Sequence, residues 1–159
     1  MHRSLAHLYS DVTQQSHIDV KLRPHVLCGG EAMSQEISLI VDDEQSVRKY
    51  IKAVLQSDGF QTLEAENGLQ ALELVRKLGT SLDLLISDIQ MPIMDGITLA
   101  EALRAELPTL PLILVSGCAE IRQANIEAEF EFVQKPFLPA TLLTIVDKVM
   151  RAKRTASSD

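Results

Sequence analysis

Short apolar runs alternate with amphipathic segments along the chain from Ile37 onwards, and this alternation constrains the fold more than any other feature of the sequence. A short apolar run bounded by polar turn residues is typical of a strand in a parallel sheet whose two faces are both covered. Five such runs occur, and each is followed by a segment with helical spacing. The predicted strands are Ile37–Val41, Phe60–Ala65, Leu84–Ser87, Leu112–Val115 and Phe130–Gln134.

The segments that follow the strands predict helices. In Ser46–Asp58, apolar residues recur at the i, i+3, i+4, i+7 and i+8 positions of an amphipathic helix, and Gly59 is a typical C-terminal cap. A second helix is expected to start at the Asn67-Gly68 turn, and a third after Gly96. The remaining predicted helices are Cys118–Glu129, in which apolar residues are sparse, and Ala140–Met150, with Pro139 at a typical first helical position.

One side of each predicted helix is apolar, as expected for helices that pack on a sheet. Strict alternation of strands and helices predicts an α/β fold with a single, open, doubly wound sheet of five parallel strands. The predicted inward-facing positions are Val47, Tyr50, Ile51, Val54 and Leu55 in the first helix, Leu69, Leu72, Val75 and Leu78 in the second, Ile97, Leu99, Ala100 and Leu103 in the third, Ile121, Ala124 and Ile126 in the fourth, and Leu142, Leu143, Val146, Val149 and Met150 in the fifth.

The two ends of the chain differ from its middle. Residues 1–36 lack a sustained helical or strand period, so we expect a poorly ordered extension before a domain of residues 37–153 and a polar tail of residues 154–159. The organised pattern begins directly after Met33, which is an alternative translation start. All four histidines lie in the extension, but their spacing matches no metal-binding pattern.

The composition of the 159-residue chain narrows its function and location. The net charge is −7, whereas binding to the phosphates of nucleic acid requires clustered Lys and Arg, so direct nucleic-acid binding is not expected. The two cysteines, Cys28 and Cys118, lie far apart and support neither a disulfide framework nor a zinc site. No apolar run approaches the roughly 18 residues of a membrane span, and the first 30 residues do not resemble a signal peptide. We therefore expect a cytoplasmic protein that does not bind membranes.

Polar side chains of the types that bind ligands or take part in catalysis follow four of the predicted strands. Asp42 and Asp43 come after the first strand and Asp88 after the third, while Ser116 and Lys135 come after the fourth and fifth. An Asp at a strand end is often only a turn former, so Asp88 alone does not indicate a reactive site. Because the carboxyl ends of parallel strands share one edge, however, these side chains are expected to converge on one pocket.

Three converging carboxylates repel one another unless a positive charge lies between them. Mg²⁺ prefers oxygen ligands of this kind, Lys135 offers a positive charge to a phosphoryl oxygen, and Ser116 offers a hydroxyl donor. These groups predict a phosphoryl-transfer site. Asp88 can itself be the nucleophile, since a reference pKa of about 3.9 leaves it ionised at neutral pH. The sequence has no glycine-rich phosphate loop, so ATP is not expected as the direct donor.

The order of these motifs resembles that of the response-regulator receiver domain, the CheY-like family of two-component signalling. The resemblance spans about Ile37 to Lys153 and implies a (βα)5 flavodoxin-like receiver fold. It also implies a sensor histidine kinase or a histidine phosphotransfer protein as the phosphodonor. The motifs that carry it are Asp42-Asp43, Asp88-x-x-Met91-Pro92-x-Met94-Asp95-Gly96, Ser116-Gly117 and Lys135-Pro136-Phe137.

The resemblance assigns the acidic residues to a phosphoacceptor and a metal site. By this resemblance, Asp88 is the phosphoacceptor. Asp43, Asp88 and the main-chain carbonyl of Gln90 are Mg²⁺ ligands, and Asp42 acts directly or through water.

Further roles are implied for residues of the fourth and fifth strand ends. Ser116 is expected to hydrogen-bond the phosphoryl group and Lys135 to pair with it, with a cis peptide bond between Lys135 and Pro136. Phe132 lies where the family has an aromatic rotamer switch, and its alternative role is that of a core residue. Unlike a Tyr, Phe132 has no hydroxyl group to take part in partner recognition.

Two departures from the family pattern concern the end of the predicted domain. The stretch from Ser116 to Lys135 is shorter than usual for the family, which is expected to shorten or distort the fourth helix. Leu138 stands where a Ser, Thr or Asp would cap the last helix, and a missing cap costs ~1 kcal/mol.

The sequence therefore predicts a signalling phosphoacceptor and not a turnover enzyme. Because no output domain is expected after Met150, the protein should act by docking to a downstream protein or by passing the phosphoryl group onward in a phosphorelay. One alternative is a haloacid-dehalogenase-type phosphohydrolase, in which the nucleophile follows the first strand, as Asp42 does here. Another is a receiver-fold adaptor that works without phosphorylation, although such a scaffold needs no converging carboxylates.

Overall fold

A computed structural model of the protein describes residues 35–117 and 129–156. The histidines, Met33, both cysteines and nearly all of the predicted fourth helix lie outside the described residues. Within the two described ranges, no helix has both the length and the apolar composition that crossing a lipid bilayer requires.

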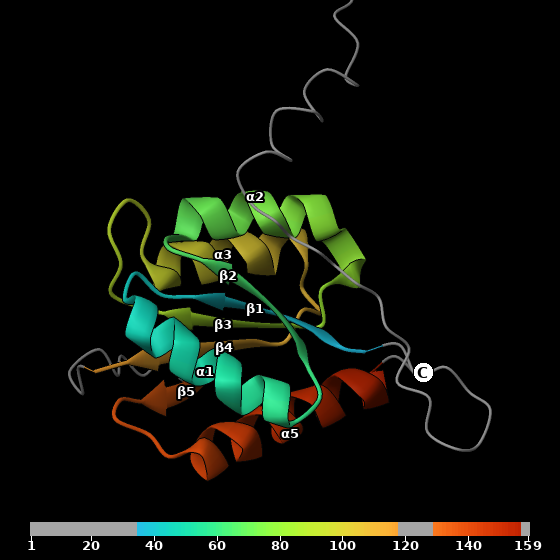
Figure 1. The fold of residues 1–159 in the computed structure, drawn as a ribbon. Helices are drawn as coiled ribbons and strands as arrows, with labels where there is room; N and C mark the ends of the chain where they lie inside the picture. The colour runs from blue at the N-terminus through green and yellow to red at the C-terminus, as the bar shows by residue number, and fades with distance from the viewer. Residues whose placement is uncertain (1–34, 118–128, 157–159) are drawn as a thin grey trace, which may run out of the picture. The chain divides into compact units, whose positions relative to one another are not determined.

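Five parallel strands form one sheet in the order β2-β1-β3-β4-β5 (Figure 1). The predicted α/β fold with an open, doubly wound parallel sheet is confirmed. Each strand has bounds within one residue of those that the apolar runs predict. The strands are β1 (Ile37–Val41), β2 (Gln61–Ala65), β3 (Leu84–Asp88), β4 (Leu112–Ser116) and β5 (Glu131–Gln134).

The small shifts at the strand ends have identifiable causes. Phe60 does not open β2 because its amide donates to the carbonyl oxygen of Leu55 at 3.1 Å and so closes the preceding helix. Asp88 and Ser116 belong to their strands because a polar side chain does not interrupt the main-chain ladder, in which Asp88 pairs with Val115 and Ser116 with Gln134. The polar residues therefore lie on the last rungs of the sheet, at one edge.

Helices cover both faces of the sheet. As Figure 1 shows, α1 and α5 lie on one face and α2 and α3 on the other. Successive strand residues point to opposite faces, so Leu39 packs in the apolar cluster beneath α2 and α3, whereas Ile40 packs beneath α1 and α5. The helices are α1 (Gln45–Ser57), α2 (Gly68–Leu78), which is followed by the 3₁₀ turn η2 (Gly79–Ser81), α3 (Gly96–Glu106) and α5 (Pro139–Ala156).

Side-chain caps fix the starts of α2 and α3. The side chain of Asn67 accepts a hydrogen bond from the amide of Gln70 at 2.9 Å, and that of Asp95 accepts one from the amide of Thr98 at 2.8 Å. Such caps satisfy amides that have no partner within the helix. The second helix therefore starts at the Asn67-Gly68 turn, as the sequence predicts.

The inward face of α2 differs from the predicted one. Leu69 was expected to face the sheet but is 46% exposed, which makes that prediction wrong. Gly68 packs against Met94, so the buried stripe starts one residue earlier and includes Ala71 and Leu72. The next residue, Leu69, is turned about a quarter of the way around the helix and points outward.

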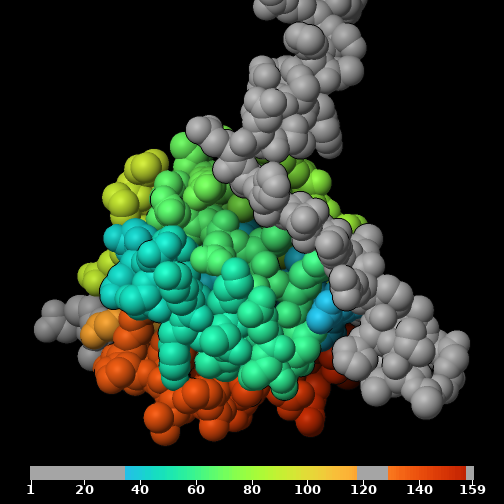
Figure 2. Space-filling view, in the orientation of Figure 1, coloured from blue at the N-terminus to red at the C-terminus, as the bar shows by residue number. Residues whose placement is uncertain are grey.

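The inward face of α1 also differs. Tyr50 was expected to face the core but is 40% exposed, and its ring contacts that of Phe137. Arg48 is buried instead, on the same helix face as Ile51 and Leu55. Figure 2 shows the side of the described unit on which α1 and α2 flank the edge strand β2, whose side chains are mostly half-buried.

The last helix is longer than the apolar pattern predicts. The last helix was expected to end at Met150, but α5 continues to Ala156, into the expected polar tail of residues 154–159. Long-range ion pairs support these added turns: Lys153 Nζ lies 2.8 Å from Asp83 Oδ1, and Arg154 Nη2 lies 2.8 Å from Glu36 Oε1. Glu36, at the predicted boundary of the N-terminal extension, is thus tied to the end of the domain.

Candidate functional site

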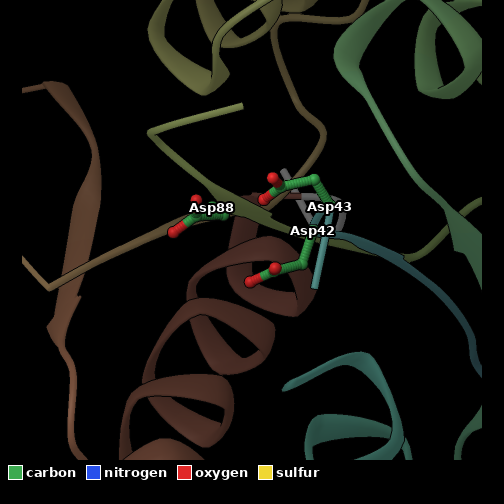
Figure 3. Close-up of side chains that lie close together, drawn as sticks. All are labelled: Asp42, Asp43 and Asp88. Atoms are coloured by element: carbon green, nitrogen blue, oxygen red, sulfur yellow. The ribbon is translucent and has the colours of Figure 1, made fainter. Parts of the chain in front are cut away.

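Three carboxylates meet at the carboxyl edge of the sheet. One oxygen each from Asp42, Asp43 and Asp88 lies within 4.8 Å of the others. Figure 3 shows Asp42 and Asp43 approaching from the turn after β1 and Asp88 from the end of β3. Asp42 and Asp88 are 1% and 6% exposed, while Asp43 is exposed. The predicted convergence of the acidic residues is therefore found in the fold.

The sheet itself aligns these residues. Val41, the last residue of β1, pairs with Ser87, so Asp42 and Asp88 follow on neighbouring strands at the same level. The amide of Glu44 then donates to Asp42 Oδ1 at 2.8 Å, just before α1 begins. This bond turns the chain so that Asp43 stays at the edge of the sheet.

Lys135 lies between the two buried carboxylates. Its Nζ is 2.7 Å from Asp42 Oδ2 and 2.8 Å from Asp88 Oδ1. The main-chain amide of Lys135 donates to the carbonyl oxygen of Ser116 at 2.8 Å, and the Lys135-Pro136 peptide bond is cis, as predicted. Mg²⁺ was the candidate for a positive charge among the carboxylates, and Lys135 was expected to pair with a phosphoryl oxygen. In the structure, Lys135 itself pairs with two of the carboxylates.

Burial is the largest influence on the pKa of Asp88 and raises it. The hydrogen bond and the positive charge of Lys135 oppose this rise, the negative charges of Asp42 and Asp43 add to it, and the pKa ends above its ordinary value. Burial also lowers the pKa of Lys135, but the two carboxylates outweigh burial and leave that pKa raised. Lys135 is therefore held in its charged form, and the charged form of Asp88 is under electrostatic strain.

The donor set fits a hydrated divalent cation. Its members are carboxylate oxygens, which Mg²⁺ prefers, and the exposed Asp43 leaves one side of the cluster open to water. A cation at this point would also offset the negative charges of Asp42 and Asp43, which add to the rise that burial causes in the pKa of Asp88. Gln90 is exposed, two residues after Asp88, on the loop that leaves β3.

The loop after β3 passes very close to the site. A Cβ atom at Gly96 would overlap the carbonyl oxygen of Asp88, and the amide of Gly96 donates to the carbonyl oxygen of Ile89 at 2.9 Å. Met91 and Met94 are partly buried and pack against the apolar cluster beneath α2 and α3. The main chain at Gly96 therefore lies directly against the main chain of Asp88.

Ser116 and Phe132 lie on the neighbouring strands. Ser116 is fully buried at the last position of β4. Phe132 is half-buried in β5, where it pairs with Leu114 and packs against the apolar cluster beneath α2 and α3. Its packing agrees with the core role that was the alternative for Phe132, and its role as a switch stays a prediction.

Sequence reasoning missed two contributors to this edge. Arg48 donates from Nη1 to the carbonyl oxygen of Asp42 at 2.6 Å, and the hydroxyl of Tyr50 donates to the carbonyl oxygen of Phe137 at 3.0 Å. A signal for Arg48 was present, because its cation interrupts the apolar stripe of α1 three residues before Ile51.

Comparisons with known proteins agree with this geometry. A family profile, the response regulator receiver domain, matches residues 38–147. The chain is 41% identical over 115 residues to the sensor kinase CckA of Brucella abortus, which covers 70% of this chain and 12% of that protein. It is 38% identical over 118 residues to the chemotaxis protein CheY-3 of Vibrio cholerae, which covers 70% of this chain and 88% of that protein.

One solved structure resembles this chain in both sequence and fold. The crystal structure of the receiver domain from the hybrid histidine kinase CckA has a TM-score of 0.62 and 34% sequence identity. The match covers 72% of this chain and 98% of the chain in that crystal structure. The matched region is therefore a whole unit in some relatives and a small part of much longer proteins in others.

Proposed function

Because the chain belongs to the response regulator receiver family, it is a phosphoacceptor module of two-component signalling, and we propose that Asp88 accepts the phosphoryl group. One observation carries this assignment. Asp88 is a buried carboxylate at a strand end, paired with Lys135 and in reach of Asp42 and Asp43. A residue needed only to end a strand would not require two further carboxylates and a lysine around it.

The proposed reaction uses groups of this chain in definite roles. A carboxylate oxygen of Asp88 attacks the phosphorus of a phosphohistidine on a partner protein. The P–N bond breaks, the imidazole nitrogen takes a proton from solvent, and the product is an aspartyl phosphate at Asp88. Lys135 then pairs with a phosphoryl oxygen, and the hydroxyl of Ser116 donates a hydrogen bond to another.

The acidic pocket is proposed to hold Mg²⁺. Asp42, Asp43, Asp88 and the main-chain carbonyl of Gln90 would supply its ligands, with Asp42 acting directly or through water. When bound, the ion would neutralise charge on the carboxylates and on the phosphoryl oxygens. Lys135 holds Asp42 and Asp88 in place before the ion and the phosphodonor arrive.

The phosphorylated state is proposed to signal through a shift of Ser116 and Phe132. The phosphodonor is proposed to be a sensor histidine kinase or a histidine phosphotransfer protein, and the output is docking to a downstream protein or onward phosphotransfer. The chain would catalyse at most its own phosphorylation and dephosphorylation. A cytoplasmic location fits this role, since phosphohistidine is made there from ATP.

Phosphorylation by a small molecule tests the assignment. The full chain is incubated with acetyl phosphate and Mg²⁺, and its intact mass is measured. The wild-type protein should gain one phosphoryl group, and Asp88→Asn should gain none. Asp83→Asn is a matched control, because Asp83 directly precedes the other end of β3 and pairs with Lys153. A phosphoryl gain that persists in Asp88→Asn would remove Asp88 from the proposed role.

A further inference from the structure

Arg48 is a buried cation of α1 that the proposed phosphotransfer chemistry does not use. It is 5% exposed, and an Arg is rarely buried unless it is paired. Besides its 2.6 Å bond to the carbonyl oxygen of Asp42, its Nε lies 3.4 Å from Glu64 Oε2 and its Nη2 lies 3.2 Å from Glu66 Oε1. One guanidinium group therefore joins α1 to the ends of β1 and β2.

Hydrogen bonds hold the main-chain amide, the carboxylate and the main-chain carbonyl oxygen of Asp42. Its amide donates to the carbonyl oxygen of Ala65 at 3.2 Å, and its carboxylate accepts from the Glu44 amide and from Lys135. Arg48 is the donor to its carbonyl oxygen. This oxygen lies in the same planar peptide unit as the amide nitrogen of Asp43. Whatever fixes the oxygen therefore also fixes the direction in which the main chain enters Asp43.

Stability alone does not account for a charged residue at this position. Burying a guanidinium carries a desolvation cost, and an apolar side chain of similar volume often packs with equal or better stability. Such a side chain would continue the stripe of Ile51 and Leu55. An apolar side chain has no hydrogen-bond donors. The planar fork of Arg48 can donate at once to the carbonyl oxygen of Asp42, to Glu64 in β2 and to Glu66 just after β2.

We propose that Arg48 is a positioning residue for the acidic pocket: it fixes the peptide between Asp42 and Asp43 and thereby sets the affinity of the pocket for Mg²⁺. This inference rests on the proposed function, because it takes the pocket to be the Mg²⁺ site. Groups that orient metal ligands by hydrogen bonds change metal affinity by about 10–100-fold when they are removed. An effect of this size should follow from loss of the Arg48 fork.

Calorimetric titration of the full chain with Mg²⁺ tests the inference, and it needs no phosphodonor. Arg48→Met keeps the length of the side chain but removes its donors, so Mg²⁺ affinity should fall by about tenfold or more. Arg48→Lys keeps the charge but loses the fork, so its affinity should lie between that of Arg48→Met and that of the wild type. Ile51→Val, a change at a buried position of the same face of α1, should bind Mg²⁺ like the wild type.

Amide exchange separates positioning from general loss of stability. The Glu44 amide, which is bonded to Asp42, should exchange faster in Arg48→Met than in Ile51→Val under conditions of equal global stability. Unchanged Mg²⁺ affinity in Arg48→Met would overturn the inference and leave the proposed function intact. If Arg48→Met does not fold, equal affinity in Arg48→Lys and the wild type overturns it. A wild-type protein that binds no Mg²⁺ contradicts the proposed function itself.

Discussion

Lys135 shows how a single residue makes a cluster of negative charge tolerable. It lies against Asp42 and Asp88, which are both buried, and it is only partly exposed itself. Even so, the pKa of Asp88 stays above its ordinary value, because burial and the neighbouring carboxylates outweigh the lysine. The fold thus keeps a carboxylate that destabilises it, as expected where a site is built for chemistry and not for stability.

The raised pKa of Asp88 predicts a dependence of stability on pH. A carboxyl whose pKa is higher in the folded than in the unfolded state favours folding when protonated, and this contribution is lost as the pH rises through the folded-state pKa. In metal-free buffer at pH 7, Asp88→Asn should therefore melt at a higher temperature than the wild type. The difference should shrink as the pH falls through the folded-state pKa and be absent below the ordinary value of 3.8.

Thermal unfolding in the presence of a chelator measures this effect. Asp147→Asn is the control, because Asp147 forms an exposed pair with Arg151, and exposed pairs contribute about 0–1 kcal/mol. A melting temperature of Asp88→Asn that is equal to or lower than that of the wild type at pH 7 would show that the charge of Asp88 does not strain the fold.

The junction of β3 and α3 is the element that fixes the main chain behind the proposed phosphoacceptor. Gly96 begins α3 directly against the carbonyl oxygen of Asp88, and Asp95 caps the same helix. The start of α3 and the end of β3 are therefore in contact. Any movement of the α3 start would displace the main chain of Asp88.

Gly96→Ala should disturb both elements. The added methyl group overlaps the carbonyl oxygen of Asp88, and overpacking of this kind costs about 1–3 kcal/mol. Because the overlap acts on main-chain atoms of Asp88, phosphoryl gain from acetyl phosphate should also slow. Gly117→Ala, at the same edge of the sheet, is the matched control, since a Cβ there meets no atom of the described residues within 4 Å. Equal denaturant midpoints for the two variants would refute the contact.

Elements are predictable from sequence where their signals are local. The apolar runs locate all five strands to within one residue, and the side chain of Asn67 marks the start of α2. The length of α5 is not predictable in this way, because Lys153 and Arg154 are stabilised by partners far away in the sequence. Leu69 was misplaced for a related reason: the contact of Gly68 with Met94 turns the helix.

At the scale of the whole molecule, a parallel sheet converts distant residues into one site. Asp42, Asp88 and Lys135 come together because their strands end at a common edge, and this much follows from topology. The pairing of Lys135 with both carboxylates, and the bond from Arg48 to Asp42, depend on side-chain geometry that periodicity does not encode. The sequence therefore predicted which residues meet at the site, but not the ion pairs and hydrogen bonds between them.

The position of the phosphoryl group on the chain tests the central claim most directly. Borohydride converts an aspartyl phosphate into homoserine, so the full chain can be phosphorylated with acetyl phosphate and Mg²⁺, reduced, digested and sequenced by tandem mass spectrometry. The account predicts homoserine at position 88 alone. Homoserine in place of Asp42 or Asp43, with Asp88 unmodified, would contradict it.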